Sequence, residues 1–191
     1  MKPFQKNQTF RTSTAQGVPV DINHHLPFGL GGIMIDSFQQ MLIHHFESVS
    51  GKKIYKSIIS EFEKICFEEL QLPLYLFPSD ITNILSMEKT IEKYKRILKY
   101  MTFAVFRTFQ YSQSKIEQSI LECFQQYYCL QVLVYNDLFS EDDIQKLKTT
   151  ITCFLTLLKR VFGPVNPSQF AIIKFHKVEE LYLQILNFGR L

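Results

Sequence analysis

The stretch Gly31-Gly-Ile-Met-Ile-Asp36-Ser-Phe-Gln39-Gln-Met-Leu-Ile-His-His-Phe46 decides how the rest of the chain is interpreted. Its apolar run Ile33-Met34-Ile35 follows two glycines, which predicts a short buried strand. Apolar residues then recur at the three-to-four spacing of an amphipathic helix. The residues of that pattern are Phe38, Met41, Leu42 and Phe46. The sequence therefore predicts a strand that ends at Asp36, followed by a helix over residues 37–50.

Asp36 has two interpretations. A carboxylate at the carboxyl end of a strand is where α/β folds place ligand-binding chemistry, so Asp36 is a candidate catalytic and metal-binding residue. The same residue can be the N-cap of the following helix, with Gln39 closing a capping box three positions later. Caps are far more common than active-site carboxylates, so the local pattern favours the cap.

The composition limits the class of protein. The chain has 191 residues, of which 46% are hydrophobic and 20% charged, as in a globular domain. Its net charge of +3 is too small to indicate nucleic-acid binding. The N-terminus has no apolar signal-peptide segment, and no apolar run approaches the ~20 residues of a membrane span. We therefore expect an intracellular protein of the nucleus or cytoplasm.

Cysteine and histidine spacing gives no metal site. The four cysteines are scattered without a C-x-x-C pair, which favours buried thiols in a reducing compartment. They are Cys66, Cys123, Cys129 and Cys153. The five histidines include no pair at i, i+4 and no H-E-x-x-H motif. Glycine-rich phosphate loops and the G-x-S-x-G motif are also missing from the sequence, so common enzyme classes are not indicated.

Most of the chain shows helical periodicity. Residues 1–32 lack a sustained period and are expected to form a loop-rich leader. Helices are predicted over residues 37–50, 53–70, 86–110, 114–135, 140–163 and 175–187, with Gly51 as the stop of the first. The helix over 114–135 is apolar on nearly every side, so it should be the central buried helix. We expect a mainly α protein: a leader with one short strand over residues 1–36, and a helical bundle over residues 37–191.

Two helix starts carry capping signals, and one helix carries a basic stripe. Ser114-x-x-Glu117 and Ser140-x-x-Asp143 have the spacing of capping boxes. The basic stripe of the helix over 86–110 consists of Lys89, Lys93 and Arg96. It could contact phosphate, although exposed lysines are the ordinary covering of a helix.

Several short stretches occur in the order and at the spacing of motifs in one known family. Ile35-Asp36-Ser-Phe-Gln39 is similar to its D-x-x-H element, and Phe77-Pro78-Ser79-Asp80-Ile81 to its L-P-S-E-F element. Further matches are Phe10-Arg11, His24-His25, Tyr94-Lys95, Val161-Phe162-Gly163, Phe175-His176 and Phe188-Gly189-Arg190-Leu191. Taken together, the chain resembles the CACTA-like group of eukaryotic DDE-type DNA transposases, in the region between the second catalytic Asp and the catalytic Glu.

The resemblance implies a parent enzyme in which an RNase H-like sheet carries three carboxylates. These hold two Mg²⁺ or Mn²⁺ ions, and a large helical insertion interrupts the sheet before the Glu. Only Asp36 corresponds to one of the three carboxylates; the first Asp would lie upstream of Met1 and the Glu downstream of Leu191. Because one Asp cannot hold two cations, we expect a transposase-derived fragment without a cofactor and without nuclease or transposase activity.

The chain also departs from the family pattern. Gln39 stands where the family has His, and Asn83, Leu98 and Glu180 replace an Arg, a Glu and a second His. These departures suggest a relic or truncated gene product. The alternative is a helical protein-interaction module without a catalytic role, in which Asp36 is only a cap.

The expected partners follow from these two hypotheses. DNA is implied by the parent family alone. The open edges of the strand at Ile33-Met34-Ile35 and an uncovered apolar helix face predict self-association. No membrane and no small-molecule substrate is expected.

Overall fold

The computed structural model describes residues 24–44, 47–73, 91–135 and 140–167, together with residues 178, 181 and 183. In chain order the elements are the π-helical segment η1 (His24–Gly31), α1 (Gly32–His44), α2 (Glu47–Glu63), the π-helical segment η2 (Lys64–Glu69), α3 (Ile91–Phe109), α4 (Lys115–Val134) and α5 (Glu141–Phe162). The described residues form five α-helices and no strand. The predicted mainly α fold is therefore confirmed.

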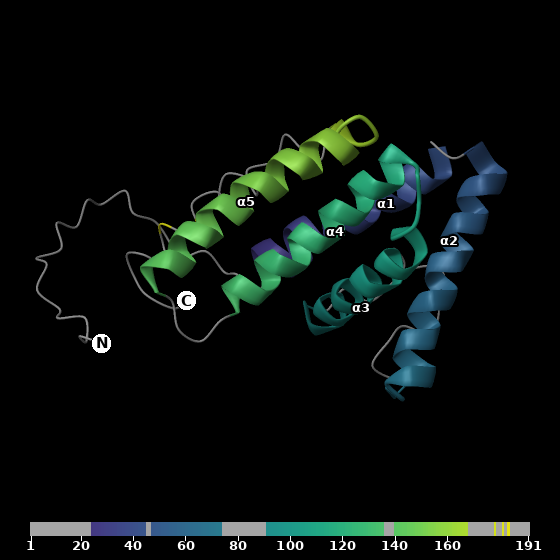
Figure 1. Cartoon of the computed structure of the whole chain (residues 1–191), viewed down its shortest axis with the longest axis horizontal. Coiled ribbons are helices and arrows are strands. Elements are labelled where there is room, and N and C mark those ends of the chain that lie inside the picture. Colours follow the sequence, from purple (N-terminus) through teal and green to yellow (C-terminus); the bar gives the residue numbers. More distant parts are fainter. Residues whose placement is uncertain are drawn as a thin grey trace, which may run out of the picture.

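The helices pack around α4 and α1. α4 lies between α5 and α3, and α2 lies on the far side of α3 (Figure 1). α1 passes behind α4 in this view and contacts α2 and α5, while η1 contacts α1 and α3. The prediction that the helix over residues 114–135 is central is confirmed, since α4 contacts α3, α5 and, through Phe124, α1.

The stretch interpreted as a strand is part of α1, so the predicted strand Ile33-Met34-Ile35 is wrong. All three side chains are buried, with exposed fractions of 5%, 0% and 2%. The helix is enclosed because η1, α2 and α5 contact it and because Phe124 of α4 packs edge-on against Phe38 at 5.2 Å between ring centroids. A helix enclosed in this way carries a continuous apolar run, which periodicity cannot distinguish from a buried strand.

Of the glycine pair where η1 meets α1, only Gly31, the last residue of η1, allows a close approach to α3 and α4. A Cβ at Gly31 would collide with Leu98 and would lie 2.7 Å from the hydroxyl oxygen of Tyr127. At Gly32 a Cβ would be 3.6 Å from Cε1 of Tyr94, which is an ordinary contact. Gly31 is therefore needed for close approach, whereas Gly32 is not.

The described part of the predicted leader is helical, and residues 26 and 29–32 are buried. Leu26 and Leu30 of η1 are 1% and 0% exposed, and the Tyr127 hydroxyl donates a hydrogen bond of 3.3 Å to the carbonyl oxygen of Leu26. The predicted loop is therefore wrong for residues 24–31. The prediction for residues 1–23 lies outside the described residues.

The core of α4 is aromatic. Phe124 and Tyr127 are both fully buried, and the Tyr127 ring packs on Phe154 of α5 with centroids 5.6 Å apart. Gln131 donates a hydrogen bond of 3.3 Å to the Tyr127 hydroxyl, so the polar end of this ring is satisfied inside the core. The predicted burial of Phe124 is confirmed.

The helix starts agree with the capping signals, one of them only in part. At α5 the Asp143 amide donates to Ser140 Oγ at 3.2 Å, and the Ser140 amide donates to Asp143 Oδ2 at 3.0 Å, which completes a capping box. At α4 the Glu117 amide donates to Ser114 Oγ at 3.5 Å, and the reciprocal half is not formed.

Other predicted boundaries shift where helices continue through a residue that usually stops them. Gly51 lies inside α2 and is buried, so it does not end the preceding helix as predicted. The start of the predicted helix over 86–110 lies outside the described residues, and α3 ends at Phe109, close to the expected position. Of the predicted last helix, only residues 178, 181 and 183 are described, and they are helical.

Candidate functional site

Asp36 lies in the second turn of α1, neither at the end of a strand nor at a helix N-terminus. The N-cap interpretation is therefore wrong, and with it the capping box between Asp36 and Gln39, because the helix begins at Gly32. The sequence signal was misleading because the residues before Asp36 are helical and not extended. Asp36 as a whole residue is half-buried among helices, and its Oδ1 atom is fully buried.

The surroundings of Asp36 are side chains of the neighbouring helices. Burial, and to a lesser extent the charge of Asp36, raises the pKa of Tyr94 on α3. One turn further along α1, Gln39 is 8% exposed and donates a hydrogen bond of 3.1 Å to the hydroxyl of Tyr55 on α2. Together, Asp36 and Gln39 form part of the packing of α1 against α2 and α3.

A two-metal site requires several carboxylates around the ions. Within the described ranges, no three His, Cys, Asp or Glu side chains lie close enough together to hold a metal ion. Among these residues Asp36 is therefore not part of a cluster of three or more such side chains. Its roles as a catalytic residue and metal ligand, and the Mg²⁺ or Mn²⁺ of the parent family, stay predictions.

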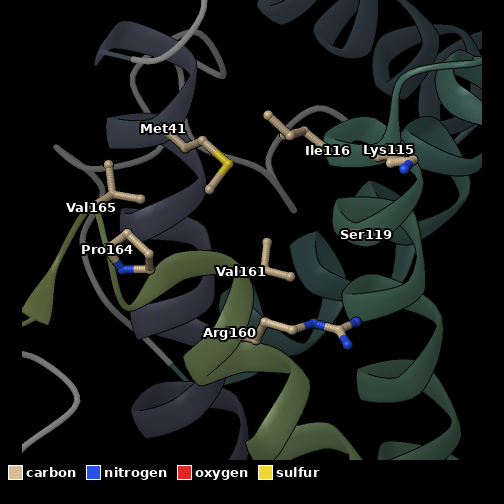
Figure 2. A pocket seen from close by; sticks show the side chains of 8 residues that line it. All are labelled: Met41, Lys115, Ile116, Ser119, Arg160, Val161, Pro164 and Val165. Atoms are coloured by element: carbon tan, nitrogen blue, oxygen red, sulfur yellow. The ribbon is translucent and has the colours of Figure 1, made fainter.

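A groove of about 370 Å³ opens where α1, the start of α4 and the end of α5 meet. Its lining residues are Met41, Lys115, Ile116, Ser119, Arg160, Val161, Pro164 and Val165. Figure 2 shows Met41, Ile116 and Val161 pointing from three different helices into the same space. The floor is apolar, and the two charged residues are both cationic.

One wall of the groove is fixed by hydrogen bonds beyond the end of α5. The amides of Val165 and Asn166 both donate to the carbonyl oxygen of Phe162 at 3.1 Å. The Asn166 side chain, 8% exposed, also donates at 3.3 Å to Ser37 Oγ, a fully buried group one turn before Met41 on α1. The wall formed by residues 163–166 is thereby attached to the helix that supplies Met41.

The sequence did not indicate this groove. Its residues come from α1, from the start of α4, and from the end of α5 and the residues just after it, and these three stretches are far apart in the chain. Each residue is ordinary for a helix surface or a helix end. Arg160 and Lys115 occur at the end of α5 and at the start of α4, where only the tertiary fold brings them to the same groove.

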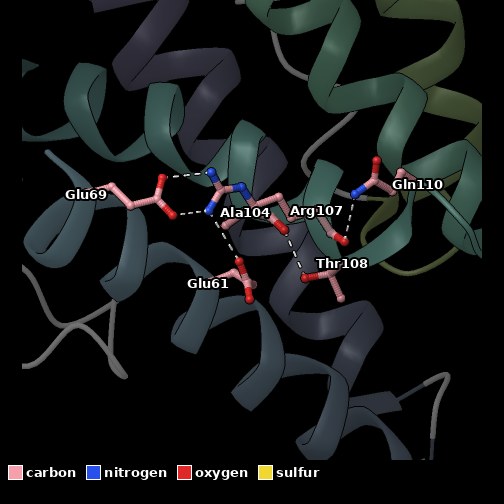
Figure 3. A network of polar contacts seen from close by, with 6 residues as sticks. All are labelled: Glu61, Glu69, Ala104, Arg107, Thr108 and Gln110. Carbon is pink, nitrogen blue, oxygen red and sulfur yellow. Dashed lines mark hydrogen bonds and ion pairs between the residues drawn. The ribbon is translucent and has the colours of Figure 1, made fainter.

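A second polar cluster joins α3 to α2 and η2. Arg107 binds Glu69 with both guanidinium nitrogens, at 2.6 and 2.8 Å, and its Nη1 is 3.6 Å from Glu61 Oε2 (Figure 3). The hydrogen bond with Arg107 lowers the pKa of the Glu69 carboxyl. The guanidinium of Arg107 already binds both carboxylates through hydrogen bonds and an ion pair. This cluster therefore connects the helices and is not a reactive site.

The cysteines divide into two groups. Cys66 and Cys123 are buried; burial raises the pKa of the Cys66 thiol to about 12 and raises that of Cys123 as well. These thiols remain protonated at neutral pH and are poor nucleophiles. Cys129 and Cys153 are exposed, so the prediction that all four are buried is wrong for these two.

Compared with models of known protein families, with curated proteins and with solved structures, the chain shows no match. Among the described residues, no helix is long and apolar enough to cross a membrane.

Proposed function

We propose that this chain is a helical protein-interaction module without a catalytic role, and that the groove between α1, α4 and α5 is its binding site. The observation that carries the proposal is the groove itself. Its floor is apolar: Met41 and Val161 are 6% and 9% exposed and Ile116 is half-buried, so an apolar side chain of a partner that enters the groove can be removed from water.

The shape of the helical bundle supports this proposal. Grooves between helices commonly accept an amphipathic helix or a short segment through a few apolar anchors. The groove volume of about 370 Å³ is near the lower end of the roughly 300–1,000 Å³ of small-molecule pockets, a size that suits one or two anchoring side chains. Asp36, in contrast, lies where α1 packs against neighbouring helices, and it does not line the groove.

A display selection tests the proposal. The full chain is used to select binders from a library of helical peptides, and each binder is retested against Ser119→Phe, which fills the groove from α4. The control is Ser60→Phe, on the exposed face of α2. We expect peptides that bind the wild type and the control but not Ser119→Phe. If every binder tolerates Ser119→Phe, the groove is not the binding site and the proposal is refuted.

Descent from a CACTA-like transposase stays a prediction. A mainly helical bundle is compatible with the helical insertion of such an enzyme, but the stretch matched to the strand before Asp36 belongs to α1. A genomic reading frame with a Glu shortly after Phe188-Gly189-Arg190-Leu191 would support the origin.

DNA binding and a nuclear or cytoplasmic location stay predictions that derive from the resemblance and the composition. Self-association was predicted partly from the open edges of a strand at Ile33-Met34-Ile35; since these residues are buried in α1, that reason no longer applies.

A further inference from the structure

We infer that the partner segment of the groove is acidic: an apolar anchor with a carboxylate about one helical turn away, held by Lys115 and Arg160. This inference rests on the proposed function and adds the chemistry of the partner. It starts from the charge of the lining, in which both ionisable groups are cations and none is a carboxylate.

Lys115 is well placed to bind an anion. It is the first residue of α4, so its ammonium adds to the positive end of the helix dipole. Within the described part of the chain, no carboxylate oxygen lies within 4.0 Å of its Nζ. The next carboxylate along α4 is Glu117, which does not line the groove. The charge of Lys115 is therefore available to a partner.

Arg160 can also be recruited by a partner. Its Nη2 is 3.7 Å from Glu122 Oε2, and the two side chains are 65% and 56% exposed. An exposed ion pair at this distance contributes little to stability. Figure 2 shows the Arg160 side chain running beside the groove, so the guanidinium can bind an incoming carboxylate at small cost. Bidentate binding of a carboxylate is the geometry that guanidinium groups favour.

The apolar floor complements these charges. Met41 is flexible and polarisable, so it can adjust to anchors of different shape. Pro164 and Val165 belong to the wall that the Asn166–Ser37 hydrogen bond attaches to α1. A wall held in place before binding reduces the ordering cost of association. The groove thus combines an adaptable floor, a fixed wall and a cationic edge.

The two cations of the groove, Lys115 and Arg160, can be compared with exposed lysines on another helix. The lysines Lys53 and Lys56 on α2 are also exposed, but they do not line this groove. They provide a matched control for net charge. A partner attracted only by the overall charge of the chain would respond to the loss of either pair, whereas a partner held in the groove would respond only to the loss of Lys115 and Arg160.

The test uses the groove-dependent peptides from the display selection, with the full chain. Each peptide is compared with versions in which Glu and Asp are replaced by Gln and Asn, or by Lys. We expect the acidic version to bind the wild type about tenfold more tightly than the neutral one, by fluorescence anisotropy at low salt. The double variant Lys115→Glu/Arg160→Glu should reverse the order and favour the Lys version, and Lys53→Glu/Lys56→Glu should keep the wild-type order.

The outcomes separate this inference from the proposed function. Groove-dependent peptides that bind equally well in acidic and neutral versions, or that lose the same affinity in both double variants, would overturn the acidic partner and leave the interaction module standing. If no selected peptide is sensitive to Ser119→Phe, the interaction module itself fails. Circular dichroism of each variant separates loss of binding from loss of folding.

Discussion

Phe124→Ala tests the packing of the bundle at its centre. The Phe124 side chain is fully buried and packs edge-on against Phe38, so its truncation removes apolar contacts and leaves a cavity between α4 and α1. Truncation of a buried Phe costs about 3–5 kcal/mol of the free energy of unfolding. That is a large fraction of the ~5–15 kcal/mol total of an ordinary domain.

The assay is urea denaturation followed by circular dichroism, with the m-value as a check that the unfolded state is unchanged. Phe103→Ala is the matched control, because Phe103 on α3 is 40% exposed and should cost about 1 kcal/mol or less. A double-mutant cycle with Phe38→Ala should give a coupling of about 0.5–1.5 kcal/mol for the aromatic pair. A loss below about half a kcal/mol for Phe124→Ala would refute the position of α4 in the core.

Three further predictions address close packing, thiol exposure and pH. Gly31→Ala should lower the free energy of unfolding by about 1–3 kcal/mol, because its Cβ would collide with Leu98 and Tyr127. Gly32→Ala should leave the stability of the protein unchanged or raise it. Equal thermal midpoints of the two variants would contradict this contrast. A maleimide should label Cys129 and Cys153 in the native protein, and Cys66 and Cys123 only after denaturation, as read by peptide mass spectrometry; rapid native labelling of the second pair would show that they are not buried. Because the hydrogen bond with Arg107 lowers the folded-state pKa of Glu69, the stabilisation from this pair is present above the ordinary carboxyl value of about 4 and is lost as the pH falls through the folded pKa. Arg107→Ala should raise the pKa of Glu69 in an NMR titration, while that of Asp143, which Ser140 lowers, stays unchanged; an unchanged Glu69 would exclude the ion pair.

The sequence predicted the fold best where one helix face is polar and the ends carry local signals. The residues of α5 alternate between a buried and an exposed face, and Ser140 with Asp143 marks its start by a local hydrogen-bond pattern. Such signals depend only on residues close in the chain. For this reason the bounds of α4 and α5 agree with the expected ones within about two residues.

The sequence misled where tertiary packing encloses an element. Ile33-Met34-Ile35 is buried because four other elements surround α1, and the resulting apolar run has no helical period. The misassigned strand then placed Asp36 at a strand end. One incorrect element therefore produced both the candidate catalytic position and the predicted strand edge.

The groove could not be predicted from local patterns. Lys115 and Arg160 are separated by the length of two helices in the chain, and they meet because α4 and α5 are antiparallel neighbours. The Asn166–Ser37 hydrogen bond joins residues 129 positions apart. Contacts of this kind depend on the complete topology, and a single sequence contains no spacing that indicates them.

Hydrogen exchange of the full chain, with and without a selected acidic peptide, tests the central claim most directly. We predict that the peptide slows amide exchange in three segments: α1 around Met41, α4 around Ile116–Ser119, and the end of α5 with the residues that follow it, from Arg160 to Val165. The exposed face of α2, with Lys53 and Lys56, should exchange at the same rate in both samples. Protection located on α2 or α3 and missing from the three groove segments would contradict the account.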